Sequence, residues 1–128
     1  MLFAEGVVFA LRDCLEVFEE LGIKIEQIIA SGGGAKSRVW RQIQADVFNK
    51  EISMTQSIEQ AAMGAAILSG VGVGIYKDVK DGCKKVVKLK EEKIKPIPEN
   101  VDIYNHQFKI YQSLYQDLKK DFKRLGEK

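Results

Sequence analysis

Three consecutive glycines, Gly32 to Gly34, constrain most what this chain can fold into. They follow a short apolar run, Gln27–Ala30, which is too short for a helix and indicates a buried strand over residues 26–30. They precede Ser37, a favoured N-cap residue, and a helical pattern over residues 38–48. A strand that passes through glycines straight into a helix is expected to leave several backbone N–H groups free beside the positive end of the helix dipole. The sequence therefore predicts a place where an anion or a nucleotide approaches the backbone.

Two familiar phosphate-binding motifs do not match this turn. The Walker A loop requires glycine at the positions that Ala30 and Ala35 occupy. The dinucleotide fingerprint requires a third glycine where Ser37 stands, and no acidic residue ends a following strand at the expected distance. By spacing alone, a purely structural turn stays open as the alternative to a nucleotide site.

Helices and strands are predicted to alternate up to residue 69. An amphipathic helix over residues 3–21 is indicated by apolar residues at steps of three and four, namely Val7, Ala10, Leu11, Cys14, Leu15, Phe18 and Leu21. A second strand is predicted over residues 51–55. Ser57–Gln60 has the spacing of a capping box before a helix over residues 61–68, whose small side chains allow close packing. This order predicts an α/β core over residues 3–69.

The rest of the chain is predicted to add a peripheral segment and one long helix. Gly70, Gly72 and Gly74 are expected to loosen residues 70–98, which hold a short polar helix and a lysine-rich extended run. Over residues 99–125 the apolar positions alternate steps of four and three, which indicates an amphipathic helix. We expect this helix to pack onto its own domain, with a self-associating coiled coil as the alternative.

Composition and charge exclude several classes of protein. With 128 residues, 45% hydrophobic and 30% charged, the chain has the makeup of one globular domain. Its net charge is only +2, and the eight lysines of residues 77–95 come with no arginine, which favours a solvated face over a nucleic-acid surface. No apolar run approaches the roughly 20 residues of a membrane span. Neither nucleic acid nor a membrane is expected as a partner.

The two cysteines and the single histidine carry no recognisable chemistry. Cys14 and Cys83 lack the paired spacing of a disulfide framework or a zinc site, which indicates a reducing, cytoplasmic compartment. His106 lies off the apolar stripe of its helix and is expected to face solvent. We expect Trp40 to anchor the core and Asp46 to be a structural partner, and neither to be catalytic.

Four stretches of the sequence resemble a known family of enzymes. They are Glu5–Asp13, the turn Ser31-Gly32-Gly33-Gly34-Ala35-Lys36-Ser37, Trp40–Val47 and Ala62–Ala66. In order and without large gaps, they resemble the C-terminal part of the xylulose kinases, which belong to the FGGY carbohydrate kinases. The resemblance runs from about Phe3 into the final helix. It implies the C-terminal part of an actin-like, ribonuclease H-like ATPase domain, helix-rich and without the antiparallel strands that come first in that domain.

The resemblance also implies where ATP binds. The main chain of Gly32, Gly33, Gly34 and Ala35 is expected to flank the adenine and ribose, and Ser37 to cap its helix, touch the adenine, or do both. Lys36 is expected to face outward, and Glu59 to support a loop. In the family, the catalytic aspartate, the sugar pocket and the Mg²⁺ ligands all lie before the region that this chain matches. No catalytic and no metal-binding residue is therefore assigned here.

The implied activity belongs to a longer kinase. It is the transfer of a phosphoryl group from ATP to D-xylulose, with an N-terminal kinase domain as the missing partner of this chain. The chain alone is expected to be inactive, because it lacks the base and the metal ligands. Two alternatives stay open, a kinase of another sugar or polyol and a non-catalytic interaction module. Because a two-stranded sheet is marginal alone, a homo-oligomer formed through its open edges is also expected.

Overall fold

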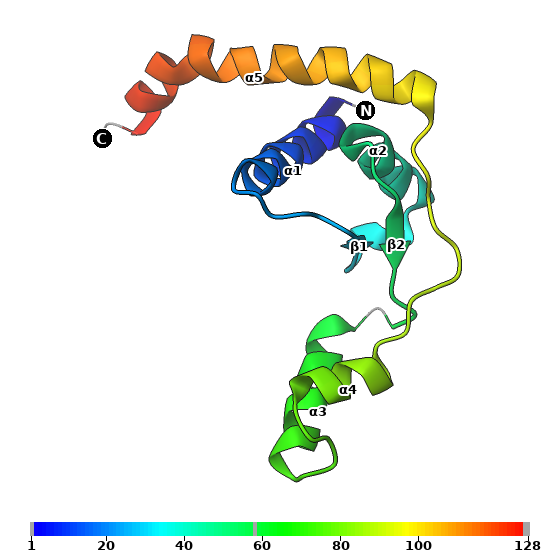
Figure 1. Cartoon of the computed structure of the whole chain (residues 1–128). Coiled ribbons are helices and arrows are strands. Elements are labelled where there is room, and N and C mark those ends of the chain that lie inside the picture. The colour runs from blue at the N-terminus through cyan, green and yellow to red at the C-terminus, as the bar shows by residue number, and fades with distance from the viewer. Residues whose placement is uncertain (1, 58, 127–128) are drawn as a thin grey trace.

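The computed structural model describes residues 2–57 and 59–126, and Figure 1 shows their arrangement. The first half of the chain alternates helix and strand, and the second half is helical. In chain order the elements are α1 (Leu2–Glu20), β1 (Ile28–Ala30), the 3₁₀ turn η1 (Gly34–Lys36), α2 (Arg38–Phe48), β2 (Ile52–Met54), α3 (Gln60–Gly72), α4 (Val79–Val86) and α5 (Pro98–Gly126).

The two strands lie side by side and parallel, joined by the glycine turn and α2. Ile28 is opposite Ile52, and Ala30 is opposite Met54. Both predicted strands are therefore present, each shorter than the sequence indicates. The parallel pairing follows from α2, which carries the chain back over the sheet before β2 begins.

The segment after α4 covers the second edge of β2. Ile94 exchanges two backbone hydrogen bonds with Ile52, of 2.9 and 3.0 Å, and Leu89 forms a bridge with Thr55. Ile94 is buried in the same apolar cluster as the strands. Residues 88–95 thus lie closer to the core than the peripheral position that their lysine content indicates. Within the described chain, only the β1 edge of the sheet is without a neighbouring strand.

Helix α2 separates two apolar clusters. Its Ala45 faces the sheet in a cluster with Ala30, Ala35, Ile52, Met54 and Ile94. Its Ile43 and Val47 face the helices in a cluster with Val8, Phe9 and Phe108. Phe48 packs against both clusters. This arrangement explains why α2 carries apolar residues on two sides.

Helix α1 buries a different face from the one predicted. Val8 and Phe9 are buried, whereas Val7, Leu11 and Phe18 of the predicted stripe are exposed, and so is Cys14. The period is correct, but apolar residues surround most of this helix, so the period alone did not identify the side that packs on α2 and α5. The other apolar side of α1 is left uncovered in the described chain.

The first half of α5 lies across α1 and α2, and its second half extends beyond them (Figure 1). Phe108 is 2% exposed, with Tyr104 and Tyr111 packed around the same cluster. The guanidinium of Arg12 lies 4.2 Å from the centre of the Phe108 ring and donates a 3.0 Å hydrogen bond to the carbonyl of Val47. The expected packing of the terminal helix onto its own domain is confirmed for this half.

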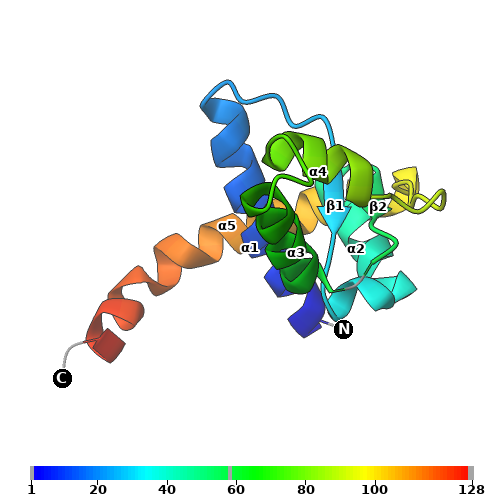
Figure 2. The ribbon, with the colours of Figure 1, turned by 90° about the horizontal axis from the view of Figure 1, so that it is seen from below.

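Helices α3 and α4 form a hairpin that projects from the sheet, as the two perpendicular views show (Figures 1 and 2). Gly70 lies inside α3 and Gly72 is its last residue, so the expectation that these two glycines loosen the chain is wrong. The close packing predicted for the small side chains of residues 61–68 occurs instead at Gly70 and Gly82. An added Cβ would come within 2.6 Å of the Tyr76 ring at Gly70 and within 2.7 Å of Ile67 at Gly82. Ala61, Ala62, Ala65 and Ala66 are instead exposed.

The capping box predicted at Ser57–Gln60 is absent. The N-cap of α3 is Glu59, whose side chain makes no capping hydrogen bond. The Gln60 amide turns back instead and donates to the carbonyl of Ser57 at 2.7 Å and to the Thr55 hydroxyl. The Gln60 side chain thus provides a hydrogen-bond donor to two oxygens that lie just after the end of strand β2. Ile58, within the same run, lies outside the described residues. No described helix is long and apolar enough to cross a membrane.

Candidate functional site

The glycine turn is a single turn of 3₁₀ helix that begins in a left-handed conformation. Gly32 has φ of +75°, and Gly33 has returned to right-handed values of −61° and −41°. The amides of Ala35, Lys36 and Ser37 donate to the carbonyls of the three glycines at 3.0–3.2 Å. These three N–H groups are therefore engaged inside the turn. The expectation of several free N–H groups does not hold for them.

The turn is open to solvent on its glycine side. All three glycines are exposed, and an ideal Cβ placed on Gly32 or Gly33 would meet no atom within 4 Å. A Cβ on Gly34 would come within 3.3 Å of the Trp40 indole nitrogen. A flat group can therefore reach the main chain of Gly32 and Gly33, whereas glycine at Gly34 makes room for Trp40.

Ala35 anchors the turn rather than facing a ligand. Its residue exposure is 3%, and its methyl group lies in the cluster around the sheet with Ala30 and Met54. Only the main chain of Ala35 can thus contribute to binding. The residue fixes the distance between the exposed glycines and the strand below them.

Ser37 caps helix α2. Its hydroxyl oxygen accepts a 3.2 Å hydrogen bond from the amide of Trp40, and its backbone is extended with φ of −75° and ψ of 118°. This confirms the predicted cap. Ser37 remains exposed, so its hydroxyl can also be reached from outside.

Trp40 packs against the cluster between α1, α2 and α5, which confirms it as an anchor. The preceding residue, Val39, was not identified from the sequence as part of a site. It is 64% exposed on the first turn of α2, next to the glycine turn. The sequence does indicate an exposed apolar residue here, because Val39 lies off the apolar stripe formed by Trp40, Ile43 and Val47.

Arg41, on the next turn of α2, is a buried cation that the sequence also did not single out. Its Nη1 lies 3.7 Å from a carboxylate oxygen of Glu92, in the segment that pairs with β2. Nε and Nη1 find no hydrogen-bond partner within the described residues. The contact joins α2 to residues 88–95 on the side of α2 that faces the sheet.

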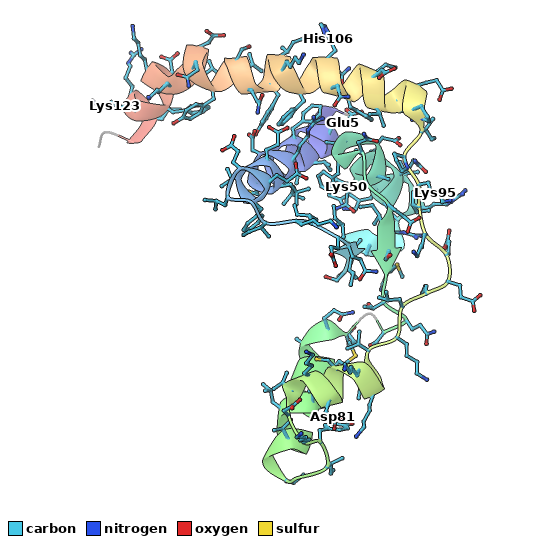
Figure 3. All side chains as sticks on the ribbon, in the orientation of Figure 1. Glu5, Lys50, Asp81, Lys95, His106 and Lys123 are labelled. Carbon is cyan, nitrogen blue, oxygen red and sulfur yellow. The ribbon has the colours of Figure 1, made fainter. Side chains whose placement is uncertain are left out.

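The other candidates keep the roles expected of them. Lys36 is exposed, and His106 points away from α1 and α2 (Figure 3). Asp46 is buried and accepts three hydrogen bonds of 2.8 Å, from Gln42, Asn100 and the amide of Ile97. It is a structural partner, as predicted. Within the described ranges, no three His, Cys, Asp or Glu side chains gather so as to hold a metal ion.

The fold of the described chain is similar to that of solved sugar kinases. The crystal structure of xylulose kinase from Rhodospirillum rubrum superposes with a TM-score of 0.76 and 30% identity, over 93% of this chain and 24% of that one. The fold is that of the C-terminal part of an actin-like ATPase domain, and the structure belongs to the sugar-kinase class.

Sequence comparison identifies the family. Residues 3–73 match the C-terminal domain of the FGGY family of carbohydrate kinases, and the chain belongs to this family. The xylulose kinase of Staphylococcus epidermidis is 36% identical over 115 residues, which are 90% of this chain and 23% of that protein. The ribulokinase of Anoxybacillus flavithermus is 35% identical over 116 residues, 87% of this chain and 21% of that protein. The chain spans about a quarter of the length of these relatives.

Proposed function

We propose that this chain forms the adenosine-binding part of an ATP-dependent carbohydrate kinase. The observation that carries the proposal is the open space over Gly32 and Gly33, on a turn that joins a buried strand to helix α2. A purine ring and a ribose need a flat surface of main chain, and a side chain at either glycine would occupy that space. Membership of the FGGY family supports this assignment.

Each residue of the turn has a separate role in this proposal. The main chain of Gly32, Gly33 and Gly34 flanks the adenine and ribose, while Ala35 holds the turn against the core through its buried methyl group. The exposed hydroxyl of Ser37 lies at the purine edge and keeps its capping bond to Trp40. Val39 offers an exposed apolar side chain one turn further along, where it can pack against the base.

The contribution of this chain to catalysis is positioning. Phosphoryl transfer requires a base for the sugar hydroxyl, donors for the β- and γ-phosphates, and Mg²⁺ to neutralise the developing charge. The described residues do not fit a Mg²⁺ site, because no group of carboxylates converges among them. By fixing the adenosine, the turn reduces the freedom of the phosphates that a second domain must act on. We therefore expect no phosphoryl transfer by the 128-residue chain alone.

The sugar that we propose for the complete kinase is D-xylulose. The match to a xylulose kinase at 36% identity supports this choice, and the 35% match to a ribulokinase keeps another sugar as the alternative. The partner is then the N-terminal kinase domain that carries the sugar pocket. A cytoplasmic location and a part in xylose metabolism belong to the same proposal.

Amide chemical shifts of the isotopically labelled chain test the nucleotide site. Addition of ADP or ATP is expected to shift the amides of Gly32, Gly33 and Gly34 more than those of the α3–α4 hairpin. A Gly33→Val variant is expected to lose these shifts, whereas Lys36→Ala, at an exposed neighbouring position, keeps them. No response of the three glycines to millimolar nucleotide would favour the second candidate, an interaction module with a structural turn.

A further inference from the structure

Arg41 is a buried cation directly after the glycine turn. Its side chain is 8% exposed, and its amide donates a 3.1 Å hydrogen bond to the carbonyl of Ser37. It lies on the same side of α2 as Ala45, one turn further on, which packs on the sheet. The guanidinium is removed from water there, and its Nε and Nη1 have no hydrogen-bond acceptor in the described part of the chain. An apolar side chain of the same length would avoid this cost, so core packing alone does not explain an arginine at this position.

The counter-ion of Arg41 is Glu92. One carboxylate oxygen of Glu92 lies 3.7 Å from Nη1 of Arg41, and the other lies 3.9 Å from Nε of Arg38. The side chain of Arg38 is 79% exposed, so water screens its contact with Glu92. The contact with Arg41 differs, because this guanidinium is buried and forms no other ion pair with the described residues. The charge of Arg41 is therefore balanced by Glu92 alone.

The backbone around Glu92 is fixed to the edge of β2. Two residues later, Ile94 exchanges hydrogen bonds with Ile52, and two residues earlier, the amide of Lys90 donates to the carbonyl of Met54 at 2.7 Å. The carboxylate of Glu92 thus stands on a support that belongs to the sheet. By attracting the guanidinium of Arg41, it ties the first turn of α2 to this support.

The first turn of α2 carries two of the side chains that we assign to the nucleotide. Ser37, at its N-cap, and Val39 are both exposed. Trp40 holds this turn on the cluster with α1 and α5, whereas Arg41 holds it on the side of the sheet. The position of the Ser37 hydroxyl and of Val39 therefore depends on two neighbouring residues that face different parts of the fold.

We infer that Arg41 is a positioning residue of the nucleotide site, which acts through Glu92 and does not touch the nucleotide. Without the carboxylate, the guanidinium is a buried charge with no counter-ion and turns out towards water. The first turn of α2 then moves away from the edge of the sheet and takes Ser37 and Val39 with it. Nucleotide binding is weakened, although no group that contacts the nucleotide has been removed. This inference rests on the proposed function, because it concerns the same site.

A double-variant cycle, read by the affinity of the 128-residue chain for ADP, tests the inference. Glu92→Gln and Arg41→Met are each expected to raise the dissociation constant about five- to tenfold, and the double variant to raise it no further. Glu91→Gln removes the same charge at an exposed neighbouring position and should leave the affinity unchanged. An unchanged affinity of Glu92→Gln, or additive effects in the double variant, would overturn the inference.

Urea unfolding separates positioning from a purely structural role. Arg41→Met is expected to be at least as stable as the parent chain, because it removes a buried charge, and yet to bind ADP more weakly. If this variant lost stability but kept its affinity, Arg41 would serve the fold alone and the inference would be wrong.

A measurement without nucleotide keeps the inference distinguishable from the proposed function. The amide of Arg41, which is bonded to the carbonyl of Ser37, is expected to exchange its hydrogen at least about fivefold faster in Glu92→Gln than in the parent chain or Glu91→Gln. Equal exchange rates in the three chains would overturn the inference. If the parent chain did not respond to ADP, the proposed function would fail, and these rates alone would decide whether Glu92 fixes the first turn of α2.

Discussion

The carboxylate of Asp46 accepts a 2.8 Å hydrogen bond from the side-chain amide of Asn100, and this contact fastens the start of α5 to α2. The same carboxylate accepts from the amide of Ile97 and from Gln42. A buried carboxylate with three donors stabilises the fold, whereas removing it leaves those donors without a partner. One residue thus holds together two segments that are about fifty positions apart in the chain.

Asp46→Ala is expected to lower the free energy of unfolding by about 2–4 kcal/mol, because three donors lose their acceptor in a buried place. Urea unfolding followed by circular dichroism measures the change. Asp102→Ala, which removes an exposed carboxylate from the same region of α5, is the control and should change stability by less than about 0.5 kcal/mol. Equal effects of the two substitutions would contradict the structural role of Asp46.

Alanine substitutions at two positions of the glycine turn are expected to differ in stability, because only one of the two glycines has a left-handed backbone conformation. Gly32→Ala should cost about 1 kcal/mol of stability, because φ of +75° is unfavourable for a residue with a Cβ. Gly33→Ala should leave stability within about 0.5 kcal/mol, because its φ is −61° and its Cβ meets nothing within 4 Å. Thermal unfolding of the two variants compares them, and a larger loss at Gly33 would contradict the described turn.

Most of the fold could be predicted from the sequence, because its signals are local. Apolar period located the described α-helices and both strands, although reading Gly70 and Gly72 as breakers ended the predicted α3 four residues too early. The larger errors lie where distant partners decide. Which side of α1 is buried depends on α2 and α5, and the position of Ile94 in the core depends on its pairing with Ile52. Neither contact produces a periodic pattern of apolar residues in the segment that makes it, so the sequence of that segment does not predict it.

The candidate site was predictable in its position but not in its detail. Three glycines between a strand and a helix predict an exposed turn, and Ser37 caps α2 as expected. The conformation of the turn was not predictable, because glycine alone does not determine whether the amides of Ala35 to Ser37 point outward or close a 3₁₀ turn. The gap that Gly34 leaves for Trp40 also becomes visible only in three dimensions.

The α3–α4 hairpin is expected to respond very differently to two neighbouring glycine substitutions. Gly70→Val should destabilise it by about 1–3 kcal/mol, because even a Cβ would lie 2.6 Å from the Tyr76 ring. Gly72→Ala should stabilise it by up to about 1 kcal/mol, because Gly72 is helical and has no neighbour within 4 Å. Hydrogen exchange of the α3 amides measures both effects locally. Similar effects of both substitutions would show that Tyr76 does not pack on Gly70.

The stability of the chain is expected to fall at high pH as Tyr104 ionises. Burial, together with the hydrogen bond that the phenol donates to Glu5 at 3.1 Å, raises the pKa of Tyr104 from 10.0 to about 12. The folded state therefore holds this proton more tightly than the unfolded state. Its contribution is fully present below pH 10.0 and is lost as the pH rises towards about 12. Phenolate absorbance as a function of pH measures the ionisation of Tyr104. Urea unfolding at the same pH values measures the accompanying fall in the free energy of unfolding.

Two variants identify the source of this pH dependence. Tyr104→Phe should cost about 1 kcal/mol at neutral pH through the lost hydrogen bond, and should show a shallower decline of stability at high pH. Glu5→Gln keeps the phenol but removes the carboxylate, so the pKa of Tyr104 should move back towards its ordinary value. Tyr115→Phe, at an exposed position of the same helix, is the control. If Tyr104→Phe declined as steeply as the parent chain, the pH dependence would have to come from the lysines.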